Sequence, residues 1–476
     1  MKKNNSNNQN PDDQLQASLS RLEKALRGDS CGYFEEDELE DIIDYYQDEF
    51  LLSKAKKAID FALRLHPDSV PVKARLARHY MQNQQYDKAD ELIHKLLSIE
   101  PENTDVLLCR AEYLLVKGHP DDAKMLFRKI QRLSGDDEEN ICLDIAYIYM
   151  NHELYKEARS FLMEGFAKGG KTDADLCFEL AYCDEELKLY DDAVRIYNII
   201  LDQDPYSNEA WFSLGKIYFI QGNYQKAGEA YDYAYLTGND DYQALLNLAH
   251  CYFQDGDYDK AIATYQKFAS KTGQSSSLLM FIGECYEQKG DLDTAIRYYQ
   301  QAAQLVPENA DVWAGICYCK MEQEKYEEAL PLALKALSLN DKSGAFWVYL
   351  GDIYENLNNP DKALDAYFKA RAFFPDSADL ESSIGEIYVY KGECDEALPF
   401  LLNAQKLNPD LPELPLLLAV VYYQKGQQDE AIEKLTLAIV KDADNRASFF
   451  DLCEDAKTNP KFKHFFIDDE NKKKNK

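Results

Sequence analysis

The sequence lacks the features that mark membrane proteins and metalloproteins. No apolar run approaches the roughly 20 residues that a membrane-spanning helix needs, and the start, MKKNNSNNQNPDDQ, has no apolar core of a secretory signal. The seven histidines form no H-E-x-x-H motif and the eleven cysteines form no C-x2-C pair. We therefore expect a cytoplasmic protein with no metal, no cofactor and no contact with a membrane.

Positive charge is also scarce. The chain has 53 Lys and Arg against 85 Asp and Glu, which gives a net charge of −32 at pH 7. Binding to nucleic acid depends on clustered Lys and Arg that contact phosphates, so this balance argues against a nucleic-acid partner. An acidic surface favours basic partners.

Three of the cysteines reveal a period. Cys251, Cys285 and Cys319 are each separated by 34 residues, so they occupy one repeated position. Equivalent helices of neighbouring repeats lie at least about 8–10 Å apart, whereas a disulfide needs Cα atoms within about 7 Å. We expect these cysteines to be small buried residues and not disulfide partners.

Residues 344–377 show what one period contains. Gly351 and Tyr354 belong to an i, i+3, i+4, i+7 pattern that predicts one face of a first helix. Ala363 and Tyr367 predict the face of a second helix that packs against it. Gly351 has no side chain, so the second helix can approach closely, and Pro375 ends the unit because proline cannot continue a helix. The full first-helix face consists of Trp347, Leu350, Gly351 and Tyr354.

The small residue of the second helix recurs through almost the whole chain. Nine of its eleven intervals are 34 residues and two are 35. The series is Ala55, Ala89, Ala123, Ala158, Ala193, Ala227, Ala261, Ala295, Ala329, Ala363, Ala397 and Ala431. A lone helix pair cannot bury both of its faces, so the pattern predicts one stack of helix pairs and not several globular domains.

The pattern W-x2-L-G-x2-Y, A-x3-aromatic, P over 34 residues resembles the tetratricopeptide repeat. The resemblance covers about 410 residues, from 36 to 445. It implies an all-α fold, a right-handed α-solenoid superhelix of tandem helix-turn-helix units that binds peptides or proteins in its concave groove. The twelve expected repeats are 36–69, 70–103, 104–137, 139–172, 174–207, 208–241, 242–275, 276–309, 310–343, 344–377, 378–411 and 412–445.

The ends of the chain differ from the repeats. Residues 1–11 are polar and predicted to be disordered, and 12–35 are predicted to hold a capping helix and a linker. The stripe Leu15, Leu19, Leu22 and Leu26 favours packing on the first repeat over a membrane-surface helix, because the polar face is not basic. We expect C-terminal capping helices over 446–468, including a short helix with Phe462, Phe465 and Phe466. Residues 469–476 form a basic tail, either disordered or folded onto the acidic body.

The two 35-residue intervals place glycines where six of the twelve repeats have a terminal proline. Gly135 and Gly169 suit helix C-caps, and the extra residue makes either a tolerated loop insertion or a hinge. Residues 165–172, GFAKGGKT, also match the phosphate-loop pattern G-x4-G-K-[ST]. That site needs a strand before the loop, whereas a helix is expected here, so we favour a glycine cap followed by a polar turn.

In the resembling family the groove is lined by repeat positions 2, 5, 9 and 12, which form one helical stripe. Here the middle of that stripe is aromatic, and beyond Glu284 it is acidic. The expected peptide-binding residues are Leu143, Tyr147, Phe178, Tyr182, Phe212, Lys216, Phe219, Leu246, His250 and Phe253. The expected acidic residues are Glu284, Glu287, Asp311, Asp352, Glu355, Asp379 and Glu386. The alternative is that several of the aromatic residues belong to the core.

These observations favour a non-catalytic scaffold or adaptor that binds a segment of a partner protein with basic and apolar residues. A nucleotide-dependent enzyme acting through residues 165–172 is the first alternative, and a self-assembling structural array is the second. The identity of the partner is not encoded in any motif of the sequence.

Overall fold

The computed structural model describes residues 11–27, 32–135, 138–169, 172–238, 241–463 and 465. The predicted disordered N-terminus up to residue 10, the basic tail 469–476 and Phe466 lie outside these residues. The chain divides into two compact units, which are described separately. Unit 1 comprises residues 1–223 and 236–239, and unit 2 comprises 224–235 and 240–476.

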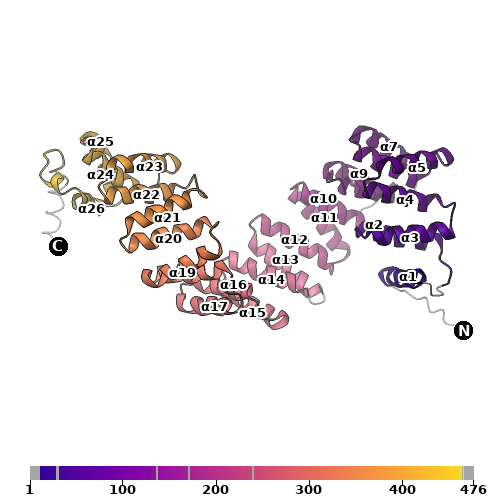
Figure 1. Cartoon of the computed structure of the whole chain (residues 1–476), viewed down its shortest axis with the longest axis horizontal. Coiled ribbons are helices and arrows are strands. Elements are labelled where there is room, and N and C mark those ends of the chain that lie inside the picture. The colour runs from indigo at the N-terminus through magenta and orange to yellow at the C-terminus, as the bar shows by residue number, and fades with distance from the viewer. Residues whose placement is uncertain are drawn as a thin grey trace. The chain divides into compact units, whose positions relative to one another are not determined.

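The fold is all-α, with 26 α-helices and no strand among the described residues. Within each unit, successive helices pair as antiparallel hairpins and the hairpins stack into an α-solenoid (Figure 1). The helices of unit 1 are α1 Pro11–Leu26, α2 Glu36–Asp48, α3 Leu52–Leu65, α4 Val70–Gln82, α5 Tyr86–Ile99, α6 Thr104–Val116, α7 Pro120–Leu133, α8 Glu138–Met150, α9 Tyr155–Lys168, α10 Ala174–Glu186, α11 Tyr190–Gln203 and α12 Asn208–Ile220.

Unit 2 continues the same alternation of first and second helices. Its helices are α13 Tyr224–Thr237, α14 Tyr242–Gln254, α15 Tyr258–Thr272, α16 Ser276–Gln288, α17 Leu292–Leu305, α18 Ala310–Glu322, α19 Tyr326–Leu339, α20 Gly344–Asn356, α21 Pro360–Arg371, α22 Ala378–Tyr390, α23 Cys394–Leu407, α24 Leu414–Gln424, α25 Gln428–Lys441 and α26 Asn445–Leu452. The last turn of α13 is assigned to unit 1. Where each repeat begins and ends stays a prediction.

The close approach within a hairpin depends on the small residue of the first helix. A Cβ added at Gly351 in α20 would lie 2.3 Å from Cε1 of Tyr367 in α21, and one at Gly283 would lie 2.8 Å from the same atom of Tyr299. Both tyrosines are 1% exposed. Each ring therefore fills the space that a side chain on the first helix would take, as the sequence pattern predicted.

The first helices begin at residues that can cap them. In unit 2, Ser377 accepts a hydrogen bond from the amide of Leu380, and Ser275 accepts one from Leu278. A side-chain oxygen at this position satisfies one of the amides that the first turn leaves without an intrahelical partner. The short polar turns of the sequence therefore set the starting points of the helices.

Both ends of the described chain cover a terminal hairpin. Leu19 and Leu22 of α1 are buried in one cluster with Leu39 and Ile42 of α2. In unit 2, Phe462 is buried with Phe449 and Phe450 of α26 and with residues of α24 and α25. These contacts bury apolar surface that the terminal hairpins would otherwise expose to solvent.

The ten described cysteines are buried. Cys251, Cys285 and Cys319 are at most 1% exposed, as the 34-residue spacing predicted. Cys317 and Cys319 point to different neighbours, since Cys317 Sγ lies 3.6 Å from the carbonyl oxygen of Ala329 and Cys319 Sγ lies 3.8 Å from Glu287 Oε2.

Glycines follow the second helices at both 35-residue intervals. Gly135 has φ 58° and Gly169 has φ 149°, values that favour glycine. The division between the two units falls at residues 223 and 224 and not at either interval. The hinge at these intervals therefore stays a prediction.

Candidate peptide-binding surface

Buried tyrosines on second helices of unit 2 fix carboxylates on the first helices. Tyr299 of α17 donates a hydrogen bond to Glu287 Oε2 of α16 at 2.7 Å. The Tyr367 hydroxyl of α21 lies 2.6 Å from Asp352 Oδ1 and 2.8 Å from Glu355 Oε2, both on α20. Because each tyrosine is anchored in the core of its hairpin, it holds these carboxylates in place on the first-helix face.

We call Glu284, Glu287, Asp352, Glu355 and Glu386 the acidic surface of unit 2. All five are half-buried, and burial is the main cause that raises the pKa of each. The pKa of Glu284 rises to about 7, helped by the charges of Glu287 and Asp311. The tyrosine hydrogen bonds oppose the rise at Glu287, Asp352 and Glu355, because a donor stabilises the charged form.

Within the described ranges, no basic side chain pairs with the acidic surface. Several lysines of unit 2 pair with other carboxylates, such as Lys289 with Asp259 and Lys391 with Asp361. None makes an ion pair with any of the five carboxylates of the acidic surface. A cationic ligand would relieve the cost of burying them.

A cavity of about 300 Å³ opens beside this surface. Glu284 and Glu287 of α16 form part of its wall, Tyr318 of α18 and Tyr349 of α20 contribute rings, and the predicted site residue Phe253 of α14 completes it. A water molecule occupies about 30 Å³ of liquid, so the space admits a side chain. The cavity thus combines negative charge with aromatic walls.

The predicted site residues of unit 1 lie on three first helices, α8, α10 and α12. Tyr147 and Tyr182 are each 40% exposed, and the other predicted residues except Lys216 are half-buried. Two of them already contact neighbouring rings within the unit, since Tyr182 lies 6.1 Å from Tyr155 and Phe178 lies 6.1 Å from Tyr197, measured between ring centroids. The half-buried set is Leu143, Phe178, Phe212 and Phe219.

Lys216 is engaged within the chain. Its Nζ lies 2.8 Å from Oε2 of Glu185 on α10, and Tyr197 donates to Oε1 of the same carboxylate at 2.7 Å. Glu185 is 8% exposed and was not selected from the sequence. Glu185 lies 34 residues before the predicted site residue Phe219, so the two occupy the same position in successive repeats. The repeat period could therefore have identified Glu185.

The three predicted residues of unit 2 lie on α14 and are half-buried. His250 Nδ1 is 2.7 Å from the hydroxyl of Tyr265, its ring packs edge-on against Phe281, and burial lowers its pKa. His250 therefore remains uncharged at neutral pH and supports the wall rather than supplying charge. Leu246 packs against the buried cluster that includes Ala249 and Tyr265. Whether the predicted residues of both units form one continuous strip stays a prediction.

The phosphate-loop alternative conflicts with the local structure. Gly165 lies inside α9 and is buried, and a Cβ there would lie 2.8 Å from Leu176 Cδ1. Residues 155–168 are helical, so no strand precedes the loop. Gly170 and Lys171 lie outside the described residues.

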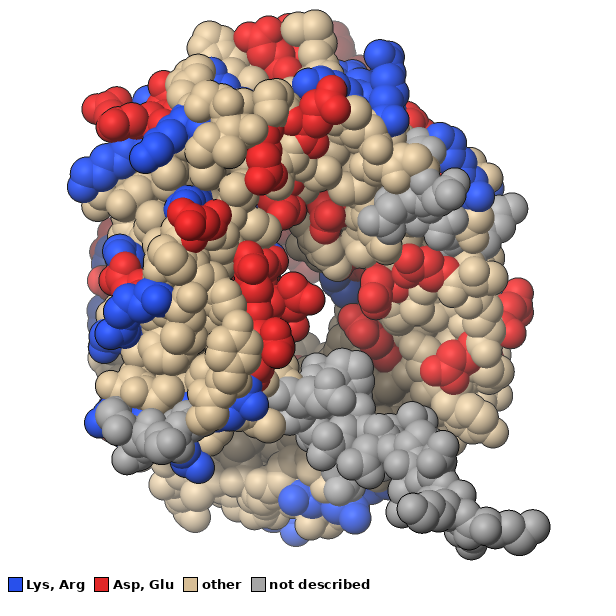
Figure 2. Space-filling model, turned by 90° about the vertical axis from the view of Figure 1, so that its right-hand side faces the viewer, with Lys and Arg blue, Asp and Glu red and all other residues tan. Residues whose placement is uncertain are grey.

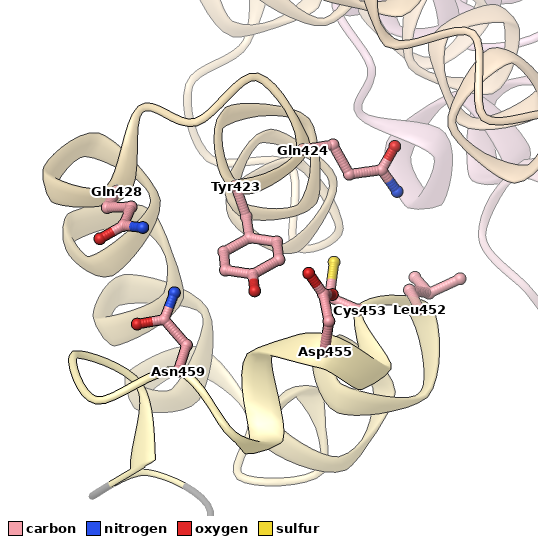
Figure 3. Close-up of a pocket in the computed structure, with 7 residues that line it drawn as sticks. All are labelled: Tyr423, Gln424, Gln428, Leu452, Cys453, Asp455 and Asn459. Carbon is pink, nitrogen blue, oxygen red and sulfur yellow. The ribbon is translucent and has the colours of Figure 1, made fainter.

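Other parts of the described chain offer less chemistry. A cavity of about 530 Å³ lies near the C-terminal segment, where Tyr423, Asp455 and Asn459 face one another (Figure 3). No group of three or more His, Cys, Asp or Glu residues in the described ranges could hold a metal ion. Among the described helices, none combines the length and the apolar character that a membrane-spanning segment needs. Figure 2 shows acidic and basic side chains side by side at several places on the face that it displays.

Three family models match the chain. Residues 234–446 match the C-terminal domain of cilia and flagella-associated protein 70, and residues 186–268 match subunit 3 of the anaphase-promoting complex, or cyclosome. Residues 49–113 match the tetratricopeptide repeat itself. The chain is a tetratricopeptide-repeat protein. The resemblance seen in its sequence is thereby confirmed, together with its all-α solenoid fold.

Individual relatives of this tetratricopeptide-repeat protein are distant. The human protein O-mannosyl-transferase TMTC1 is 25% identical over 162 residues, which are 33% of this chain and only 18% of that relative. The MamA chain in its crystal structure is 25% identical, with a TM-score of 0.33. The alignment covers 36% of this chain and 94% of the MamA chain. The Cut9–Hcn1 structure is 16% identical, has a TM-score of 0.40 and covers 86% of this chain and 94% of its own.

Proposed function

We propose that this tetratricopeptide-repeat protein is a non-catalytic scaffold whose first-helix face binds a segment of a partner protein. Stacked helix pairs of this kind are typical of protein–protein interaction, and the matching models belong to repeat families. Apolar residues of a segment bound to unit 2 would contact the rings on α14, and those of a segment bound to unit 1 would contact the rings on α8, α10 and α12. Basic residues of the segment bound to unit 2 would contact the acidic surface of unit 2.

One observation carries the proposal. The acidic surface has five half-buried carboxylates without a basic partner among the described residues, and tyrosine hydroxyls hold Glu287, Asp352 and Glu355 in place. Burying charge without a counter-ion costs stability. Binding of a cationic segment would offset the free-energy cost of these buried carboxylates.

The test uses charge-neutral variants of nearly identical shape. We expect the triple variant Glu284→Gln, Glu287→Gln, Glu355→Gln to lose most of its affinity for a labelled peptide rich in lysine and leucine, measured by fluorescence anisotropy. An analogue with glutamine in place of lysine should bind weakly to the unmodified protein. Added salt should weaken the interaction, because exposed charges are screened.

The matched control is the triple variant Glu308→Gln, Asp365→Asn, Glu433→Gln. These three side chains are exposed, lie in the same unit and change the net charge by the same amount. Equal losses in both triple variants would mean that only the overall charge attracts the peptide, and the proposed site would be wrong. The cytoplasmic location and the absence of catalysis stay predictions.

A further inference from the structure

Unit 1 contains a cavity of about 690 Å³ that is distinct from the acidic surface of unit 2. Its walls come from first helices of neighbouring hairpins: α2, α4, α6 and α8. Two arginines of α4, Arg75 and Arg78, lie in its wall. Of its lining residues, only Tyr147 was predicted from the sequence to bind a peptide.

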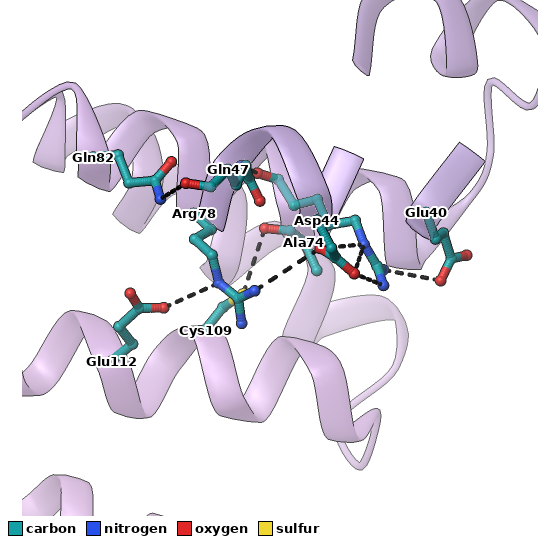
Figure 4. Close-up of polar contacts among 9 residues, drawn as sticks. Glu40, Asp44, Gln47, Ala74, Arg78, Gln82, Cys109 and Glu112 are labelled. Atoms are coloured by element: carbon teal, nitrogen blue, oxygen red, sulfur yellow. Dashed lines mark hydrogen bonds and ion pairs between the residues drawn. The ribbon is translucent and has the colours of Figure 1, made fainter. Parts of the chain in front are cut away.

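Both arginines form ion pairs with carboxylates of the chain. Arg75 Nε lies 2.9 Å from Asp44 Oδ1 and its Nη1 lies 2.9 Å from Glu40 Oε2. Arg78 lies between Asp44 and Glu112, with its Nε 3.3 Å from Glu112 Oε2 (Figure 4). These ion pairs join the hairpins, so the arginines serve the framework of the cavity.

The amide side chains of the same wall leave acceptors without a partner. Gln47 is 0% exposed, and its Nε2 donates to the carbonyl of Arg75 at 2.9 Å. Its Oε1 is buried and has no hydrogen-bond partner, and the same holds for Oε1 of Gln82. A buried acceptor left unpaired costs about 1–3 kcal/mol, so each one calls for a donor that completes it.

The rim of the cavity adds charge and rings. Asp48 and Asp105 are exposed carboxylates on α2 and α6 and make no ion pair within the described ranges. Phe50 is 77% exposed and Tyr147 is 40% exposed. The cavity therefore presents carboxylates and aromatic faces besides its two paired arginines, and its carboxylates outnumber its arginines.

We propose that this cavity binds the side chain of an arginine on a partner protein segment. A guanidinium carries five N–H donors and no acceptor, which complements a wall of unpaired amide oxygens and carboxylates. Its plane also stacks on aromatic faces, such as those at the rim. Lysine fits less well, because its ammonium is a compact charge with three donors. This site lies in unit 1 and does not depend on the acidic surface of unit 2.

The test compares three short peptides that differ in one side chain. Calorimetric titration of the full chain with acetyl-phenylalanyl-arginine amide should show binding. The citrulline analogue, which has nearly the same shape without the charge, should bind at least about tenfold more weakly, and the lysine analogue should lie between them. Hydrogen exchange should slow in α2 and α4 on addition of the arginine peptide.

Two variants locate the interaction. Gln47→Leu should weaken arginine binding about tenfold while the melting temperature stays equal or rises, since a buried unpaired acceptor is removed. If Gln47→Leu fails to fold, Asp105→Asn at the exposed rim should weaken binding by itself. The unit 2 triple variant should bind the arginine peptide as the unmodified protein does.

Several results would overturn the proposal. Equal affinity for the arginine and citrulline peptides would show that the guanidinium is not recognised, and absence of binding would show that water alone fills the cavity. Unchanged affinity in both Gln47→Leu and Asp105→Asn would place any binding elsewhere. Loss of arginine binding in the unit 2 triple variant would assign the peptide to the acidic surface instead.

Discussion

The two units use one repeated position of the first helix in opposite ways. In unit 1, Asp44, Arg78 and Glu112 occupy it in successive hairpins at intervals of 34, so each carboxylate has an arginine within its own unit. In unit 2, Glu284 and Asp352 occupy it, and neither pairs with a basic residue among the described ones. The same backbone thus either neutralises charge internally or leaves it for a ligand.

The difference has consequences for both stability and binding. Carboxylates paired with arginine support the stacking of hairpins in unit 1. Carboxylates without a counter-ion oppose folding in unit 2, because burial raises their pKa and favours the neutral form. Under the proposed function, unit 2 would give up stability in the free protein that binding of the basic segment restores, a cost that is common at functional sites.

The largest expected effect is on the ion pairs of unit 1. Arg75→Met leaves Asp44 and Glu40 without their partner, and Arg75 is only 17% exposed. Removing one member of a buried pair typically costs about 3 kcal/mol or more, so thermal unfolding should begin at a clearly lower temperature. Arg195→Met is the control. The Arg195 side chain is 75% exposed, so its ion pair with Asp192 should contribute less than about 1 kcal/mol to the free energy of unfolding. Equal effects of the two variants would contradict this account of unit 1.

The aromatic part of the predicted site should affect binding more than folding. Phe212→Ala with Phe219→Ala removes two half-buried rings of α12. Anchors of this kind typically cost about 2 kcal/mol or more of binding energy, measurable with the lysine- and leucine-rich peptide. Phe127→Ala is the control for the core, because this ring is 0% exposed and its removal should cost about 3–5 kcal/mol of stability. A drop in melting temperature of similar size in both variants would show that Phe212 and Phe219 are core residues.

A smaller effect is expected on the pH dependence of unit 2. The pKa of Glu284 in the folded state, about 7, lies above its usual value of 4.5, so the folded state binds more protons in this range. Stability should therefore fall as the pH rises from about 4.5 to 7, by on the order of 1–3 kcal/mol in total. Glu284→Gln should remove most of this slope and raise stability at pH 8, as urea unfolding would show. A stability that rises with pH across this window, or an unchanged slope in Glu284→Gln, would contradict the assigned pKa.

The sequence predicted the fold because the period is carried by side chains that pack. Gly351 and Tyr367 form the close contact that their spacing indicated, and Cys251 and Cys285 are buried as one repeated position. Leu19 and Leu22 likewise pack on the first hairpin. These contacts are local to one hairpin or to neighbours, so a periodic sequence specifies them directly.

The site was harder to predict because a charged side chain of one repeat can form an ion pair with a residue of the next repeat. Lys216 was expected to face a ligand, but Glu185 lies one hairpin away and holds it. The cavity beside Glu284 depends on Tyr318 and Tyr349, which come from two further helices. Which carboxylates remain unpaired depends on rotamers and on the distance between hairpins, and a single sequence does not report either.

The release of protons on binding tests the central claim most directly. A cation placed next to Glu284 lowers the pKa of that carboxyl group, so near pH 7 the binding of the lysine- and leucine-rich peptide should expel part of a proton. Calorimetric titrations in buffers of different ionisation enthalpy measure this number. We predict proton release by the unmodified protein and little or none by Glu284→Gln. Binding without proton release, or equal release by the variant, would contradict the claim that the acidic surface of unit 2 receives the basic segment.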